Sequence, residues 1–133
     1  MRHFIAYHNT ERMGRSLNEG DPLTLVTNRS VQHLLQNAVW FVQGDGTAPK
    51  NYSLASVFVV NEVGETGEED FKRFARGSGH VFDPLVPLND LEWFPEFFKA
   101  LAHFSLGVHE VKEDRFVGEL MRLAEEAGYQ LVQ

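Results

Sequence analysis

Residues 38–63 read AVWFVQGDGTAPKNYSLASVFVVNEV, and this segment carries the clearest structural pattern in the chain. At residues 38–43, apolar side chains fall on both faces of an extended segment, which is typical of a buried strand. Residues 44–49 concentrate turn-forming types, and residues 52–63 form the longest run rich in β-branched and aromatic side chains. Two such runs joined by a short glycine-containing loop predict a β-hairpin.

Further strands and two helices are predicted on either side of this hairpin. Residues 2–8, 23–27 and 104–111 fit strands, the first of them apolar on both faces. A helix is expected to run from the capping residues at 89–90 to residue 102, and a second helix over residues 113–127. Strands that follow one another through short turns, with helices gathered at the end, favour an α+β fold over a doubly wound one.

The middle of the chain gives a weaker pattern. Residues 71–76 fit either a strand or a helix, and residues 77–79 (Gly-Ser-Gly) predict a break after them. Residues 83–87 contain two prolines, which predicts an extended segment outside any regular ladder. The whole chain, residues 1–133, is therefore expected to form one domain, a small mixed or antiparallel curved sheet or β-barrel with flanking helices.

Composition narrows the class of protein. A chain of 133 residues, 43% hydrophobic and 23% charged, is typical of one globular domain. The absence of cysteine excludes disulfides and thiol chemistry. No secretory signal is recognisable, and no apolar run approaches the roughly 20 residues of a membrane-spanning helix. We therefore expect a cytoplasmic protein that does not bind a membrane.

The charge is distributed unevenly along the chain. The net charge is −7, yet residues 1–60 hold five Lys or Arg against four Asp or Glu, while residues 61–133 hold seven against fifteen. The overall charge disfavours nonspecific attraction to nucleic acid. The first half of the chain can nevertheless present a locally basic face.

The familiar motifs of catalysis and cofactor binding are absent from the sequence. It contains no dinucleotide-binding or Walker glycine motif, no HExxH and no Gly-x-Ser-x-Gly. None of the six histidines forms a short metal-binding pair. We expect no cofactor, no metal site and no catalytic residue, which favours a protein that is not an enzyme.

One polar loop stands out as a candidate site. Residues 7–16 read YHNTERMGRS and leave the first strand. Loops on a rigid scaffold often carry function, and arginine grips phosphates in bidentate fashion. Asn9, Arg12, Arg15 and Ser16 are therefore candidate ligand contacts. The alternative interpretation is a solvated loop with capping residues.

The aromatic residues are a second candidate feature. Trp40, Tyr52 and Trp93 come from segments that can meet around one sheet, where a cleft lined with them would stack on a nucleic-acid base. The alternative is that they belong to the core, because aromatic side chains bury large apolar areas. Phe58 and Phe97 are expected in the core.

The predicted hairpin resembles that of PUA-like domains, in particular the EVE and ASCH groups, in which a strand containing Val-Trp-Phe is followed by one ending in a Val-x-Glu-Val type turn. This resemblance implies a small β-barrel with flanking helices that binds RNA or modified DNA bases. A single-stranded, flipped or modified base would then enter a pocket between barrel and helices. The residues implied are Trp40 or Trp93 for stacking, Asn9 and Ser16 for the base edge, and Arg12, Arg15 and Arg29 for flanking phosphates.

Two other functions remain open. The acidic second half and the aromatic run Trp93-Phe94-Pro95 also fit a protein-interaction module or homodimer without a small-molecule site. A small hydrolase or nuclease would instead use His8 with Arg12 or Arg15.

Overall fold

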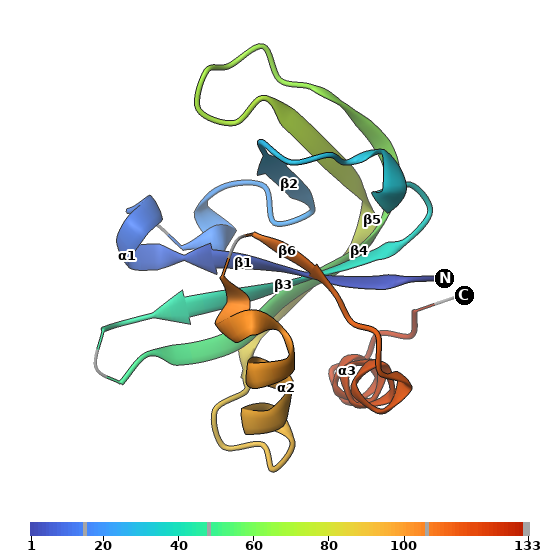
Figure 1. Cartoon of the computed structure of the whole chain (residues 1–133). Coiled ribbons are helices and arrows are strands. Elements are labelled where there is room, and N and C mark those ends of the chain that lie inside the picture. Colours follow the sequence, from blue (N-terminus) through green and yellow to red (C-terminus); the bar gives the residue numbers. More distant parts are fainter. Residues whose placement is uncertain (15, 48, 106, 132–133) are drawn as a thin grey trace.

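A computed structural model describes residues 1–14, 16–47, 49–105 and 107–131, without the side chains of Glu11 and Asn18. The chain forms one mixed six-stranded sheet that curls into a half-barrel, with helices packed against it (Figure 1). This confirms the predicted α+β fold with a curved sheet and flanking helices. The strands are β1 (His3–Asn9), β2 (Thr24–Thr27), β3 (Ala38–Asp45), β4 (Asn51–Glu65), β5 (Arg73–Pro87) and β6 (Val108–Glu110). The helices are α1 (Thr10–Met13), α2 (Phe94–Ala100) and α3 (Asp114–Glu126), with 3-10 turns η1 (Leu17–Glu19), η2 (Gln32–Leu34) and η3 (Ala102–Phe104).

The order of the strands leaves β2 and β6 at the two edges of the sheet. The sheet runs β2-β5-β4-β3-β1-β6, with β1 and β3 parallel and every other neighbouring pair antiparallel. The predicted hairpin is confirmed, because β3 pairs with β4 from Ala38 opposite Val59 to Asp45 opposite Asn51. The curl brings the two edge strands toward each other, but within the described residues they do not pair, so the barrel stays open.

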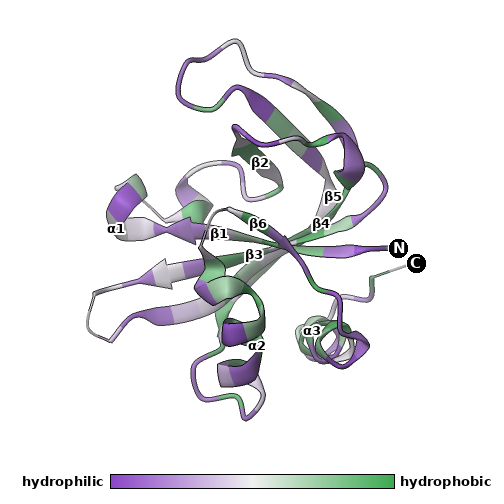
Figure 2. Ribbon diagram, in the orientation of Figure 1, coloured by the Kyte–Doolittle hydropathy of each residue, from purple (hydrophilic) through white to green (hydrophobic). Residues whose placement is uncertain are grey.

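The long strands β4 and β5 produce the curl. Their pairing shifts register between Leu54 and Ser56 and again between Val60 and Glu62. Such bulges bend a strand and increase its twist. Figure 2 shows hydrophilic and hydrophobic residues alternating along the upper halves of these strands, typical of strands with one face toward solvent.

Two glycines allow β5 to lie directly against β4. The break predicted at residues 77–79 is wrong, because all three residues lie in β5. A Cβ built on Gly77 would lie 1.7 Å from the carbonyl oxygen of Val59, and one on Gly79 would lie 1.9 Å from that of Val57. Here glycine allows the backbones of β4 and β5 to approach each other closely, and it does not form a turn. The prediction that residues 83–87 are extended is confirmed, since they lie in β5. The prediction that they stay outside the ladder is wrong for Val86 and Pro87, which pair with Leu54 and Ser53 of β4.

The sheet carries a hydrophobic cluster on each face. On one face, Ile5, Trp40 and Val42 pack with side chains of α2, η3 and α3. On the other face, Phe41 and Phe58 pack with Leu25 of β2, inside the half-barrel. Strand β1 is buried on both faces, as predicted. Within the described residues, no helix has the length and hydropathy needed to cross a membrane.

Candidate functional site

A cleft of about 800 Å³ lies where the half-barrel stays open between its edge strands. Strand β2 contributes Thr24 to Thr27 to its lining, and β6 contributes Val108. The end of β1 forms the floor with Tyr7, His8 and Asn9. The volume suits a ligand of nucleotide size, since small-molecule sites usually span about 300–1,000 Å³.

Aromatic rings form one wall of this cleft. The Tyr7 ring stacks on that of Phe104 with centroids 5.7 Å apart, and Tyr52 meets Phe104 edge-on at 5.5 Å. Behind them, Tyr52 packs at 5.0 Å against Phe98 of α2. The helices on one face of the sheet therefore hold in place rings that line the cleft.

An unusual backbone segment delivers two of the ring-bearing residues. Ala102, His103 and Phe104 have φ values of 53°, 56° and 58°. Left-handed conformations cost an L-residue about 1–2 kcal/mol each, and such strain gathers at functional sites. Both His103 and Phe104 line the cleft, and His103 also meets Phe98 edge-on at 4.8 Å. The strained turn thus places two aromatic side chains at the site.

The Tyr7 phenol lies over a glycine of the neighbouring strand. A Cβ built on Gly44 would lie 2.0 Å from the Tyr7 hydroxyl, so the glycine leaves the space that the phenol occupies. Burial, followed by the nearby Tyr52 and Asp45, raises the pKa of Tyr7 to about 12. Burial also raises the pKa of Tyr52. Both phenols therefore remain neutral hydrogen-bond donors at physiological pH.

We expect tyrosinate absorbance to show one late-titrating group near pH 12, which disappears in Tyr7→Phe. The folded protein favours the neutral phenol, so this contribution to stability is present below the unfolded pKa of about 10 and lost as pH rises through about 12. Spectrophotometric titration of the folded protein measures it. A single transition near pH 10 that Tyr7→Phe leaves unchanged in shape would contradict the assigned burial.

Polar groups surround the mouth of the cleft. Arg12 and Lys50 both belong to its lining and come from the same end of the sheet, Arg12 just after β1 and Lys50 in the turn between β3 and β4. The one carboxylate among the described lining residues belongs to Asp21, which accepts hydrogen bonds from the Leu23 N–H at 3.0 Å and the Thr24 hydroxyl at 2.7 Å. With that carboxylate engaged in holding the start of β2, the rim favours an anionic ligand.

The turn between β4 and β5 supplies another wall through Phe71. Asn28 brackets this residue, donating from Nδ2 to the Asp70 carbonyl at 2.7 Å and accepting from the Lys72 N–H at 3.0 Å. Arg73 adds a bond to the Asn28 carbonyl at 2.9 Å. The Asn28 amide thus pairs with the turn as a neighbouring strand would, and this pairing holds Phe71 at the cleft.

Asn28→Ala is expected to loosen this turn without unfolding the sheet. Removing two exposed hydrogen bonds costs about 1 kcal/mol locally, so amide exchange at Lys72 should accelerate by roughly tenfold or less. Hydrogen exchange followed by NMR measures this rate. Asn61→Ala, at an exposed position of β4, is the matched control. Unchanged exchange at Lys72 would show that Asn28 does not hold the turn.

Three of the predicted ligand residues line the cleft: Asn9, Arg12 and Tyr52. Asn9 lies just before α1 and accepts a hydrogen bond from the Arg12 N–H at 3.3 Å, so it also caps this short helix. Ser16 instead donates to buried Gln43 at 3.1 Å, which anchors the loop to β3. Arg29 lies beside the start of β6, since a Cβ on Gly107 would be 3.9 Å from its Nε. Arg15 lies outside the described residues.

The prediction that Trp40 stacks on a ligand is wrong. Its side chain is 0% exposed, and its indole N–H donates to Nδ1 of buried His3 at 3.0 Å. Trp93 is half-buried and packs edge-on against Phe97 at 5.3 Å, outside the cleft lining. Phe58 and Phe97 lie in the core, as predicted. The tryptophans are therefore part of the packing beneath the site.

Most residues of the cleft lining were not predicted from the sequence, among them Lys50, Phe71, His103 and Phe104. Lys50 follows a turn motif, and Phe71 begins a segment whose pattern is ambiguous. Nothing in the sequence marks residues 102–104 as left-handed, since none is glycine or asparagine. Of these residues, only Lys50 had a sequence signal that could have predicted it, because a cationic residue directly after a predicted turn lies at the end of a hairpin.

Among the described residues, no group of three or more histidine or acidic side chains is placed to hold a metal ion. Comparison of the chain with protein-family models, curated proteins and solved structures finds no significant match. Fold and site alone therefore define the class: an α+β half-barrel with an aromatic-walled cleft at its open seam.

Proposed function

We propose that this chain is a nucleic-acid-binding module whose cleft takes one base of a single-stranded, flipped or modified site. The observation that carries the proposal is the meeting of aromatic rings and cationic side chains in one cleft of nucleotide size. The half-buried rings of Tyr7, Tyr52 and Phe71 supply π-faces, and Arg12 and Lys50 supply positive charge at the rim. Phe104 is only 2% exposed and supports Tyr7 and Tyr52 by ring packing.

The chemistry of the lining suits a base better than a purely apolar ligand. Stacking on an aromatic side chain contributes about 1–3 kcal/mol per base and tolerates any sequence. The hydroxyl oxygens of Thr24, Thr27 and Ser105 lie in the same lining and offer acceptors to the polar edge of a base. The protons of Thr24 and Ser105 are donated to Asp21 and to the Ala102 carbonyl. The resemblance to PUA-like domains implies a small β-barrel with flanking helices, and the curled sheet shares this curvature although its edge strands do not pair.

The local charge at the cleft offsets the acidity of the whole chain. The net charge of −7 comes mainly from the second half of the sequence. Arg12 and Lys50 lie in the first half, at the cleft itself. Phosphate contacts of this kind orient a strand on the protein, while contacts to the base provide selectivity.

Fluorescence anisotropy with labelled single-stranded RNA, single-stranded DNA and duplexes carrying modified cytosine tests the proposal. We expect saturable binding to at least one of them, weakened by salt. Phe71→Ala should reduce the affinity by roughly fivefold to a hundredfold, because one stacking surface is removed. Phe74→Ala is the matched control, because Phe74 belongs to the same hairpin but lies outside the cleft lining.

Absence of binding to all three probes would overturn the proposal. Equal reductions of affinity in Phe71→Ala and Phe74→Ala would place the binding surface outside the cleft. Denaturing gels of the same mixtures report cleavage, so that probe degradation would identify the protein as a nuclease instead.

A further inference from the structure

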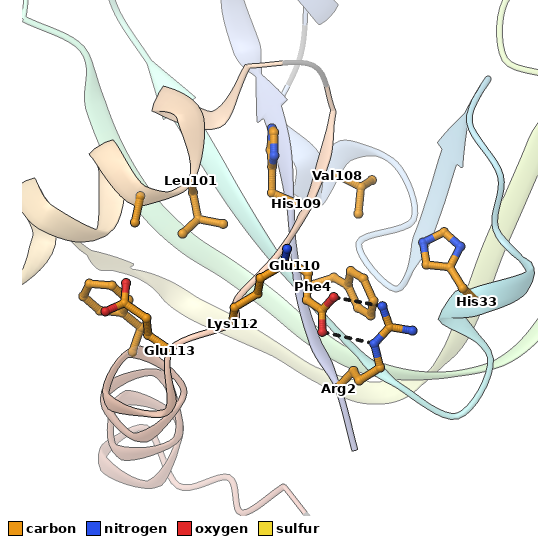
Figure 3. Close-up of a pocket in the computed structure, with 11 residues that line it drawn as sticks. Arg2, Phe4, His33, Leu101, Val108, His109, Glu110, Lys112 and Glu113 are labelled. Atoms are coloured by element: carbon orange, nitrogen blue, oxygen red, sulfur yellow. Dashed lines mark hydrogen bonds and ion pairs between the residues drawn. The ribbon is translucent and has the colours of Figure 1, made fainter.

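A second hollow, of about 570 Å³, lies along β6 beyond the end of the cleft (Figure 3). Arg2, Phe4 and His33 line it, together with Leu101 and Phe116. Val108 lines both this hollow and the cleft. The two hollows are therefore neighbours along a single edge strand.

The carboxylates of this hollow are neutralised by arginines. Glu110 accepts two hydrogen bonds from Arg2, from Nη2 at 2.8 Å and from Nε at 3.1 Å. Glu113 is paired with Arg115 at 3.2 Å. The hydrogen bond from Arg2, together with the charges of Arg2, Lys112 and His33, holds the pKa of Glu110 below its usual value. The environment of this carboxylate is thus cationic on several sides.

Cationic donors remain available after these pairs are formed. The bonds to Glu110 engage two of the five N–H donors that a guanidinium carries. Within the described part of the chain, Lys112 belongs to no ion pair. Figure 3 shows Lys112, Arg2 and His33 around the same stretch of β6. The hollow is lined by two cations, Arg2 and Lys112, and by two carboxylates, Glu110 and Glu113. What remains for a ligand is the ammonium of Lys112 and the N–H groups of Arg2 that Glu110 does not engage.

Packing fixes the orientation of these groups. The Arg2 guanidinium lies 5.1 Å from the centre of the Phe4 ring, and His33 meets the same ring edge-on at 5.4 Å. Arg29 stands beside Gly107 at the other end of β6. Cations thus follow the unpaired edge of β6 from the cleft into the second hollow.

We propose that this edge and hollow bind the phosphodiester backbone of a single strand whose base occupies the cleft. This inference rests on the proposed function and extends it, because it makes the ligand a strand of several nucleotides rather than one nucleotide. The strand runs past Arg29 and over Val108 to reach Arg2, His33 and Lys112. Sugar and phosphate contacts of this kind carry affinity and salt dependence without reading sequence.

The test compares a nucleoside monophosphate with single-stranded oligonucleotides of about eight nucleotides, a typical site size for single-strand binders. Ribose and deoxyribose oligonucleotides form separate arms. The variant is Lys112→Glu with His33→Glu, which reverses the charge at residue 112, adds a negative charge at residue 33 and leaves the cleft lining intact. The matched control is Lys99→Glu with Arg122→Glu, at exposed positions of α2 and α3 that line neither hollow.

We expect the variant to bind the oligonucleotide about tenfold more weakly, with a salt slope shallower by about 0.7 for each phosphate that the protein no longer neutralises. Binding of the monophosphate should stay at the wild-type level. The inference would be overturned if the variant bound the oligonucleotide as tightly as wild type, or if the control variant lost as much affinity. In either case, continued binding of the monophosphate would leave the proposed function standing. Failure of the wild-type protein to bind either probe would overturn both. Circular dichroism of each variant confirms that it is folded.

Discussion

Gly79→Ala is expected to lower the free energy of unfolding by roughly 3–5 kcal/mol, a large share of the 5–15 kcal/mol typical of a domain. The added Cβ would lie 1.9 Å from the Val57 carbonyl oxygen and 2.5 Å from the Phe58 Cα. Both atoms belong to the backbone of β4, so no side chain can rotate away to relieve the clash. Strands β4 and β5 would have to separate where they form the curl of the half-barrel. Chemical denaturation followed by circular dichroism measures the decrease.

Gly118→Ala provides the matched control for this prediction. Gly118 lies at an exposed position inside α3, and nothing lies within 4 Å of a Cβ built there. Alanine favours a helix over glycine by about 0.5–1 kcal/mol, so this variant should be slightly more stable than wild type. A Gly79→Ala variant with wild-type stability would show that β4 and β5 do not approach so closely.

The double variant Arg12→Glu with Lys50→Glu is expected to bind single-stranded nucleic acid at least about a hundredfold more weakly at low salt, because two attractions become two repulsions. Both side chains line the cleft, and neither takes part in an ion pair within the described residues. The dependence of affinity on salt should also flatten by about 0.7 for each phosphate left without a cationic partner. Anisotropy titrations at several salt concentrations measure both quantities.

The control for this variant is again Lys99→Glu with Arg122→Glu, which changes the net charge by the same amount away from both hollows. If the weaker binding came from overall charge alone, the two double variants would weaken binding equally. That outcome would show that the cleft is not where the nucleic acid binds. A reduction confined to Arg12→Glu with Lys50→Glu places the ligand at the rim.

Local patterns in the sequence were sufficient to predict most elements. The run before the turn at residues 44–49, apolar on both faces, and the β-branched run after it became β3 and β4. The helical spacing near the end of the chain became α3, whose buried residues include Phe116 and Leu120. These signals are local, because each element's periodicity records which of its own faces is buried.

Features that depend on contacts between distant segments were not predicted. In the sequence, the glycines at residues 77 and 79 predict a break in the strand. In the folded sheet, they allow the backbone of β5 to approach that of β4 closely, which depends on a contact between distant segments. From the sequence alone, Trp40 fits a cleft as well as it fits the core. Its packing against α2 and α3, which the structure shows, places it in the core. The left-handed turn at residues 102–104 has no local signature, yet it delivers Phe104 to the cleft. The sequence singled out the N-terminal loop because a polar loop at a strand end is a local signal, and its residues Asn9 and Arg12 line the cleft.

The central claim is that the open seam of the half-barrel binds a nucleotide base, and backbone amide NMR spectra recorded during titration with a nucleoside monophosphate test it most directly. We predict saturable chemical-shift changes concentrated at residues 7–9, 24–27 and 103–104, where β1, β2 and the left-handed turn line the cleft. Saturable changes confined to the solvent-facing side of α3, or no change at any accessible concentration, would contradict it.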